Sequence, residues 1–282
     1  MVMVLIALIL ALLGLVLGSF VNALVWRLHQ QELAIENSQL PHQADLSILH
    51  GRSMCPGCGH RLSARDLVPV FSWLALRGHC RYCSMRISLQ YPLVELLTAI
   101  IFGVSYYFWP GGLDSGGLIL LAAWLAASVG LLALLIYDAR WMLLPSKIIY
   151  PTLAVATAGR LTYLIAYEPD KTQAVFRWLA ALVLCSGMFW LLFMISRGRL
   201  IGYGDVRLGL VTGTLLASPS RSFLMLFLAS TLGLVFALPG VFKGRKNLSS
   251  QLPFGPFLIV ATGLVVFVGD RVINWYTNLF SG

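Results

Sequence analysis

Two aspartates occupy positions where an ionised side chain is costly. Asp205 follows Gly202 and Gly204 at the start of an apolar run, and Asp138 closes another apolar run. Charge at membrane depth is unfavourable, so such residues usually have a function. Two carboxylates in close contact cannot both ionise easily, and one then acts as a base on water while the other acts as an acid toward a polarised carbonyl. The pair therefore predicts hydrolytic chemistry.

Each acid also has a structural interpretation. Asp205 is a possible N-cap of the helix that follows it, and Asp138 a possible interfacial helix end. Glu95, the third acid in or beside an apolar run near the predicted cytoplasmic face, is expected to hydrogen-bond to a neighbouring helix or to face the cysteine domain.

A proton-coupled transporter is the alternative function, and it would use the same carboxylates as a proton relay. Transporters usually have inverted repeats with interrupted helices, whereas only one apolar run here is interrupted, before Val206.

Four cysteines form two C-x2-C pairs separated by 21 residues. They are Cys55, Cys58, Cys80 and Cys83. Paired C-x2-C motifs predict a tetrahedral zinc site with four thiolate ligands, which leaves no open position for water and is structural. His60 and His79 adjoin the pairs and could replace a thiolate, but a surface position is the simpler interpretation. Cys185 stands alone and is expected to be a small buried hydrophobic residue.

The composition indicates a membrane protein. Of 282 residues, 59% are hydrophobic and 11% are charged, roughly half the charged fraction of a soluble protein. The net charge of +9 comes from basic residues that lie between apolar runs and not in one patch. A nucleic-acid partner is therefore not expected, and the composition leaves the oligomeric state open.

Apolar runs and one polar segment divide the chain. The first 25 residues carry no charge, and the first cation, Arg27, follows them. A signal peptide has basic residues before its apolar core, so residues 1–26 are predicted to be a retained transmembrane helix. Within it, the stretch Gly18-Ser19-Phe20-Val21-Asn22 is polar for a lipid-facing position, so this face is expected to meet other helices. Residues 27–90 are predicted to be an aqueous domain, which at this size needs a disulfide, a metal or a neighbour to hold it together.

Residues 91–282 are predicted to be a membrane domain with seven further segments. These are about 93–108, 118–137, 148–167, 175–195, 206–217, 223–241 and 254–272. The predicted fold class is an all-α polytopic membrane protein with about eight transmembrane segments and a small zinc-binding domain. The segment at 206–217 is shorter than the ~20 residues needed to span a bilayer, so it is either a half-helix or follows backbone unwound at Gly202 and Gly204.

The basic residues predict the orientation. Fifteen of the 20 Lys and Arg residues fall on the side of residues 27–90, including Lys243, Arg245 and Lys246. The other five are Arg160, Lys171, Arg177, Arg221 and Arg271. Short cytoplasmic loops are enriched in Lys and Arg, so the cysteine domain and both aspartates are predicted to be cytoplasmic, where thiols stay reduced. Arg160 is expected to extend toward the outer surface.

Several motifs resemble those of one family. Gly202-Tyr203-Gly204-Asp205 resembles the GxGD signature of intramembrane aspartyl proteases, and Tyr137-Asp138 with Leu144-Pro145 resembles the first aspartate motif of type IV prepilin leader peptidases. Further matches run in order along the chain. They are Gly18-Ser19-Phe20-x-Asn22, Cys55-Pro56-x-Cys58-x-His60, Asp66-Leu67-Val68-Pro69, Ser72-Trp73-Leu74, Cys80-Arg81-x-Cys83, Ile87-Ser88, Tyr91-Pro92-x-Val94-Glu95-Leu96 and Pro253-Phe254-Gly255-Pro256-Phe257.

The resemblance implies a bacterial inner-membrane enzyme that removes the short basic leader from prepilins and pseudopilins at the cytoplasmic face, cutting after a glycine. Asp138 and Asp205 are then the catalytic pair, and Gly202 and Gly204 let the backbone approach the substrate strand or the other aspartate. Members with the cysteine domain are often also N-methyltransferases that use S-adenosylmethionine. Glu95 is the candidate to accept a proton from the new amino terminus during methylation.

The chain departs from the family pattern at two positions near the aspartates. The family often has a further aspartate directly after the Leu-Pro motif, where this chain has Ser146, and a lysine where it has Arg207. Ser146 removes a competing first aspartate. No G-x-G-x-x-G turn marks a nucleotide site, so the sequence leaves the place of the methyl donor open.

Overall fold

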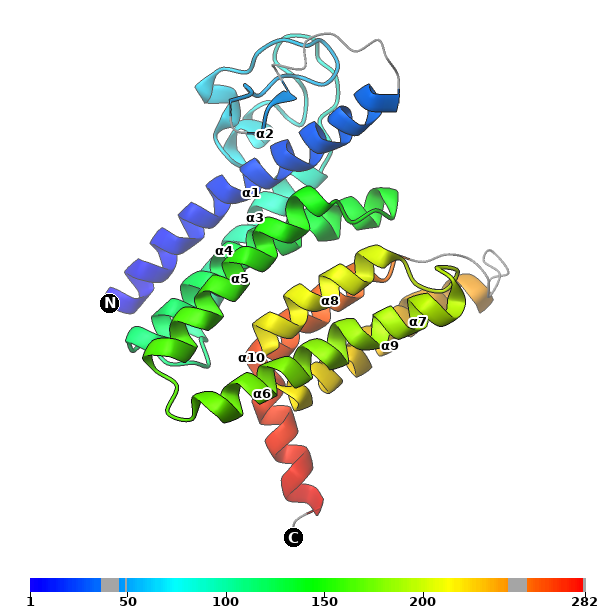
Figure 1. Ribbon diagram of the computed structural model, residues 1–282. Coiled ribbons are helices and arrows are strands. Elements are labelled where there is room, and N and C mark those ends of the chain that lie inside the picture. Colours follow the sequence, from blue (N-terminus) through cyan, green and yellow to red (C-terminus); the bar gives the residue numbers. More distant parts are fainter. Residues whose placement is uncertain (37–45, 49, 243–252, 281–282) are drawn as a thin grey trace. The chain divides into compact units, whose positions relative to one another are not determined.

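The computed structural model describes residues 1–36, 46–48, 50–242 and 253–280 (Figure 1). In chain order the elements are α1 (Val2–Glu36), η2 (Ala64–Leu67), α2 (Phe71–Ala75), α3 (Gln90–Tyr107), α4 (Ser115–Trp141), α5 (Ser146–Ala166), α6 (Lys171–Leu182), η3 (Val183–Gly187), α7 (Met188–Ser196), α8 (Tyr203–Leu216), α9 (Pro219–Phe242) and α10 (Gly255–Phe280). Within these ranges the only β-structure is two isolated bridges. The predicted all-α fold class is confirmed.

Six of the described helices are long and apolar enough to cross a membrane. They cover Val2–Ala34, Ser115–Trp141, Ser146–Ala166, Lys171–Ser196, Pro219–Pro239 and Gly255–Leu279, the fourth combining α6, η3 and α7. The predicted multi-pass membrane protein follows from these spans, but the count of eight is not confirmed. α8 has 14 residues, fewer than the ~20 of a span, and α3 contains Glu95 and begins and ends with polar residues.

The first of two compact units comprises residues 1–107. In it α1 lies along α3 (Figure 1). A Cβ atom at Gly14 would lie 2.7 Å from the Thr98 carbonyl oxygen, and one at Gly18 would lie 2.6 Å from the Glu95 Cα. Glycines therefore allow the two backbones to approach closely. Asn22 Nδ2 donates to the Tyr91 carbonyl at 3.1 Å, which confirms that this polar face meets a helix.

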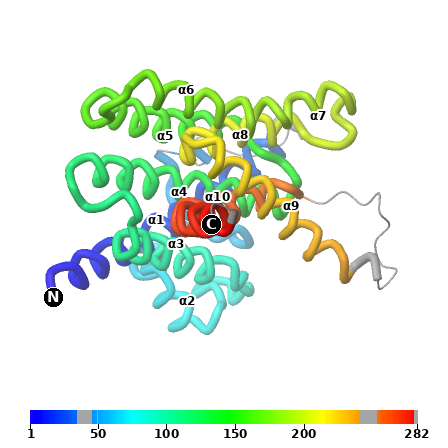
Figure 2. Tube along the Cα trace, turned by 90° about the horizontal axis from the view of Figure 1, so that it is seen from below, coloured from blue at the N-terminus to red at the C-terminus, as the bar shows by residue number. Residues whose placement is uncertain are grey.

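The second unit comprises residues 108–282. Its α10 contacts α4, α8 and α9, and Figure 2 shows it among these helices. Asp114 Oδ1 accepts from the Gly117 amide at 2.9 Å and caps α4. The short helix α8 packs against η3, where a Cβ atom at Gly209 would lie 2.8 Å from the Cys185 carbonyl oxygen. These contacts hold α8 in place within the second unit.

Two further predictions concern the domain boundaries and the basic residues that predict the orientation. α1 continues past residue 26 to Glu36. The first unit joins α1, the segment that carries the four cysteines (residues 50–89, the cysteine module) and α3. The domain boundaries at residues 26 and 90 stay a prediction. Of the cations that predict orientation, Lys243, Arg245 and Lys246 lie outside the described residues.

Candidate active site and metal centre

The two predicted aspartates come together in the second unit. Asp138 lies in the last turn of α4 and is 5% exposed. Asp205 lies in the first turn of α8 and is half-buried. Their carboxylates are close enough to interact electrostatically. The buried Oδ2 of Asp138 has no hydrogen-bond partner among the described residues, so this oxygen remains available to bond to a ligand.

A glycine from a third helix lies against Asp138. The backbone N–H of Gly255, the first residue of α10, hydrogen-bonds to the Asp138 carboxylate. A Cβ atom at this position would lie 2.5 Å from Asp138 Oδ2, well inside van der Waals contact. Only glycine can therefore place its backbone here without displacing the carboxylate.

The two glycines of the GxGD motif have different surroundings. A Cβ atom at Gly204 would lie 2.9 Å from the Leu144 Cβ, so this glycine allows α8 to approach the α4–α5 connection. Gly202 is exposed and extended, and a Cβ atom there would lie 3.7 Å from Asp205 Oδ2. Gly204 thus has a packing role, whereas a side chain at Gly202 would make only an ordinary contact with the Asp205 carboxylate.

The two departures from the family pattern contact each other. The Arg207 guanidinium donates a hydrogen bond to the Ser146 hydroxyl and lies 5.2 Å from the centre of the Tyr203 ring. Ser146 begins α5 and Arg207 lies in α8. This hydrogen bond from a cationic donor to a neutral hydroxyl joins α5 and α8.

Sequence reasoning gave no role to Leu144 or Gly255. Both belong to motifs that carry the family resemblance. Their contacts with Gly204 and Asp138 are known only from the packing of α4, α8 and α10. The available signal was Gly255 between Phe254 and Pro256, at the start of the last apolar run. A glycine at such a helix start often permits close backbone approach.

The four predicted cysteines form one cluster in the first unit. Their sulfur atoms all lie within 4.8 Å of one another, and Cys55 Sγ and Cys83 Sγ are 3.8 Å apart. Tetrahedral zinc with Zn–S distances of ~2.3 Å separates its sulfur ligands by about 3.8 Å. The donor set therefore fits a metal ion such as zinc. All five cysteines are free of disulfides, and Cys185 is buried in η3 as expected.

Each C-x2-C pair lies in the same kind of tight turn. The Cys55 amide donates to the His60 carbonyl at 2.9 Å, and the Cys80 amide donates to the Met85 carbonyl at 2.8 Å. Gly59 and Ser84, the residues directly after each pair, both have positive φ, of 68° and 58°. Each turn directs two sulfur atoms toward the same point. The short spacing within each C-x2-C motif is enough to specify such a turn.

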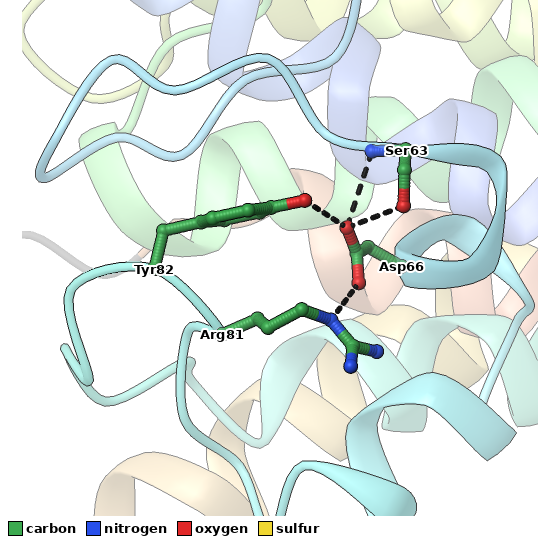
Figure 3. Close-up of polar contacts among 4 residues, drawn as sticks. All are labelled: Ser63, Asp66, Arg81 and Tyr82. Carbon is green, nitrogen blue, oxygen red and sulfur yellow. Dashed lines mark hydrogen bonds and ion pairs between the residues drawn. The ribbon is translucent and has the colours of Figure 1, made fainter.

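A hydrogen-bond network around Asp66 links the two halves of the cysteine module (Figure 3). Asp66 Oδ1 accepts from Arg81 Nε at 2.7 Å, and Oδ2 accepts from Tyr82 Oη at 3.1 Å and from Ser63 Oγ at 2.8 Å. Desolvation of the carboxyl would raise its pKa, but these hydrogen bonds, led by that from Arg81, lower the pKa of Asp66 to about 2. The ionised form is therefore the one that stabilises the module.

The low pKa of Asp66 predicts how this stabilisation varies with pH. A carboxylate whose folded pKa is depressed stabilises above its unfolded pKa, roughly 4, and loses this effect as pH falls toward the folded value of about 2. Asp66→Asn should release metal to a chelator roughly tenfold faster than wild type, because hydrogen bonds to a charged acceptor are lost. That ratio should be the same at pH 6 and pH 8. A ratio that changed tenfold between them, or an equal effect of exposed Arg65→Gln, would contradict the role given to Asp66.

Glu95 is buried beneath the cysteine module. It is 6% exposed, and its Oε2 accepts from the Val70 amide at 2.7 Å. Val70 has a positive φ of 61°, which is strained for a β-branched residue. The Ser19 hydroxyl also hydrogen-bonds to Glu95. The carboxylate therefore connects α3 to the module and to α1, in agreement with the expected structural contacts.

The fold and these two sites define a class of protein: a helical membrane protein with paired carboxylates at helix ends and a separate four-cysteine module. Residues 12–109 match the model of the bacterial peptidase A24 N-terminal domain, and residues 125–238 match that of the type IV leader peptidase family.

Named relatives cover nearly the whole chain. A prepilin leader peptidase/N-methyltransferase of Aeromonas salmonicida is 31% identical over 279 residues, which are 95% of this chain and 92% of the relative. A protein of the same name from Pseudomonas aeruginosa is 31% identical over 96% of this chain and 93% of its own. A type 4 prepilin-like proteins leader peptide-processing enzyme of Escherichia coli is 33% identical over 87% of each chain. No solved structure matches the chain.

The chain belongs to the type IV leader peptidase family. The predicted family and enzyme class are therefore confirmed, and the comparisons do not support the transporter alternative.

Proposed function

We propose that this protein cleaves the leader peptide of prepilins and pseudopilins with Asp138 and Asp205 as the catalytic pair, and then methylates the new amino terminus. The observation that carries the proposal is the meeting of two carboxylates from α4 and α8, one with a buried and unpartnered oxygen. The names of the relatives given above supply the substrate class and the second activity.

The cleavage step follows from the chemistry of a carboxylate pair. The ionised carboxylate removes a proton from water as the water oxygen attacks the scissile carbonyl carbon, and the protonated partner donates its proton to the carbonyl oxygen. The tetrahedral intermediate collapses when the C–N bond breaks and the leaving nitrogen receives a proton. Because coupled carboxylates titrate as a pair, neither residue is assigned one role alone.

The glycines beside the pair have complementary tasks in this proposal. The exposed backbone at Gly202 can approach a substrate strand next to Asp205, and Gly204 brings α8 against Leu144 so that Asp205 reaches Asp138. Gly255 orients the Asp138 carboxylate through its backbone N–H.

Gly255→Ala tests this arrangement. The added methyl group would overlap Asp138 Oδ2, and a displacement of about 1 Å in a catalytic group costs on the order of a hundredfold in rate. The matched control is Gly263→Ala on the same helix, where a Cβ atom meets Trp124 at an ordinary 3.9 Å. Cleavage assays should show a hundredfold loss for the first variant and little change for the second. Equal rates for both would remove Gly255 from the site.

The setting is proposed to be the bacterial inner membrane, with the aspartates and the cysteine module at the cytoplasmic face, as the distribution of Lys and Arg predicts. Four thiolates would hold zinc as a structural crosslink. S-adenosylmethionine would supply the methyl group when bound. No residue of this chain is assigned to hold it.

Glu95 is proposed to accept the proton that the new amino terminus loses before methyl transfer, in addition to its contact with Val70. Glu95→Gln should then impair methylation more than cleavage, because only methylation needs this base. The measurement is incorporation of labelled methyl donor into a pre-cleaved peptide. Undiminished incorporation would leave Glu95 with a structural role alone.

One experiment tests both activities. Purified protein is incubated with a peptide that carries a basic leader followed by glycine and phenylalanine, with and without S-adenosylmethionine, and the products are analysed by mass spectrometry. The expected product begins at the phenylalanine and gains one methyl group only when the donor is present. An intact peptide would contradict the proposed cleavage.

A further inference from the structure

A cavity of about 390 Å³ lies at the end of the second unit opposite the aspartates. Asp138 is near the C-terminus of α4 and Asp205 begins α8, whereas the cavity is lined by the first half of α4 and the last residues of α8. It also involves the α5–α6 connection, seen in Figure 1. This position separates the cavity from the proposed peptidase chemistry.

Three arginines and two acids line this cavity: Arg160, Arg177, Arg221, Glu168 and Asp270. Asp270 is already paired with an arginine, because its carboxylate accepts hydrogen bonds from both Nε and Nη2 of Arg221. Arg177 donates only to the neutral amide oxygen of Gln173 among its described contacts. Positive charge therefore exceeds negative charge around the cavity.

Arg160 is the central group. It is half-buried, its guanidinium lies 5.6 Å from the centre of the Tyr163 ring, and its buried Nε has no hydrogen-bond partner among the described residues. The sequence predicts that this side chain extends toward the outer surface, and the structure places it in the cavity wall. A buried N–H without an acceptor is unfavourable, and a ligand oxygen would supply the missing hydrogen bond.

The remaining wall is apolar. It includes buried Trp124, Ala156 and Val266 together with half-buried Trp109. A cavity of 390 Å³ falls within the range of roughly 300–1,000 Å³ for small-molecule sites, so it accommodates more than a simple anion. Exposed Arg177 and Asp270 lie at its surface side. Charged groups above an apolar wall, between membrane helices, match an amphiphile with an anionic head.

We propose that this cavity binds an anionic phospholipid through its phosphate. Arginine forms paired, charge-assisted hydrogen bonds with phosphate oxygens, and basic pockets between membrane helices are suited to lipid headgroups. Arg160 holds the phosphate from within and Arg177 holds it from the surface. The glycerol and the start of the acyl chains lie against the tryptophans.

The test measures lipid binding by native mass spectrometry of the full-length protein in detergent. Short-chain phosphatidylglycerol is compared with phosphatidylcholine, and inorganic phosphate is added as a competitor. Arg160→Gln removes the buried cation, and Arg177→Gln removes an exposed one whose loss leaves the helix packing intact. The matched control is Arg271→Gln, which removes an exposed cation beside Asp270 that does not line the cavity.

The expected result is about tenfold tighter binding of phosphatidylglycerol than of phosphatidylcholine to wild type, the scale of one charge-assisted hydrogen bond. Arg160→Gln and Arg177→Gln should each lose most of that preference, and Arg271→Gln should keep it. Equal binding of the two lipids, or an equal loss in Arg271→Gln, would overturn the site. Displacement of the lipid by millimolar inorganic phosphate would assign the cavity to a free anion and overturn the lipid proposal. If Arg160→Gln does not fold, unchanged binding in Arg177→Gln would still overturn it.

Discussion

Asp138→Asn and Asp205→Asn each reduce leader-peptide cleavage by about a thousandfold or more, on the scale of general acid–base catalysis. Asparagine keeps the shape of the side chain but neither accepts nor releases a proton as a carboxyl group does. The loss of one partner disables the pair, so the double variant should be no slower than either single variant by more than a few-fold. Initial rates on a prepilin-like peptide, with helix content measured in parallel, give the result.

The matched control for this expectation is Asp114→Asn. Asp114 caps α4 at the end away from Asp138, and asparagine caps a helix about as well as aspartate. This variant should therefore cleave at the wild-type rate. A folded Asp138 or Asp205 variant that cleaved within about tenfold of wild type would not belong to a catalytic pair.

The second large effect is expected at the cysteine cluster. Purified protein should contain about one zinc ion per chain, and joint replacement of Cys55 and Cys58 by serine should remove it, because two thiolates cannot complete a structural tetrahedron. Structural zinc contributes roughly 10–16 kcal/mol of binding free energy in small zinc modules. Elemental analysis measures the metal, and limited proteolysis of the first unit reports the unfolding of the module.

Cys185→Ala is the control for the metal experiment. Cys185 is buried in η3, in the other compact unit, so its replacement should leave the zinc content unchanged. The membrane helices should retain their helix content in the double cysteine variant, since each satisfies its own backbone hydrogen bonds. Full zinc content in that variant would refute the four-thiolate site.

Much about this protein is determined by short stretches of its sequence. Apolar runs specify membrane helices because their side chains avoid water locally, whatever the helices later contact. The C-x2-C pairs specify a metal cluster because two ligands come from each tight turn, and the structure places all four sulfur atoms together. Asp138 and Asp205 could be selected because few acids stand beside apolar runs.

Only the tertiary structure determined which residues from different helices lie in contact. The approach of Gly255 to Asp138, the bond between Arg207 and Ser146, and the enclosure of Arg160 each join residues from different helices. Such contacts depend on how helices pack, and hydrophobic runs and local spacing carry no information about which faces meet. For the same reason the count of eight spans was not confirmed. An apolar run marks a helix, but its length and packing decide whether it crosses the membrane.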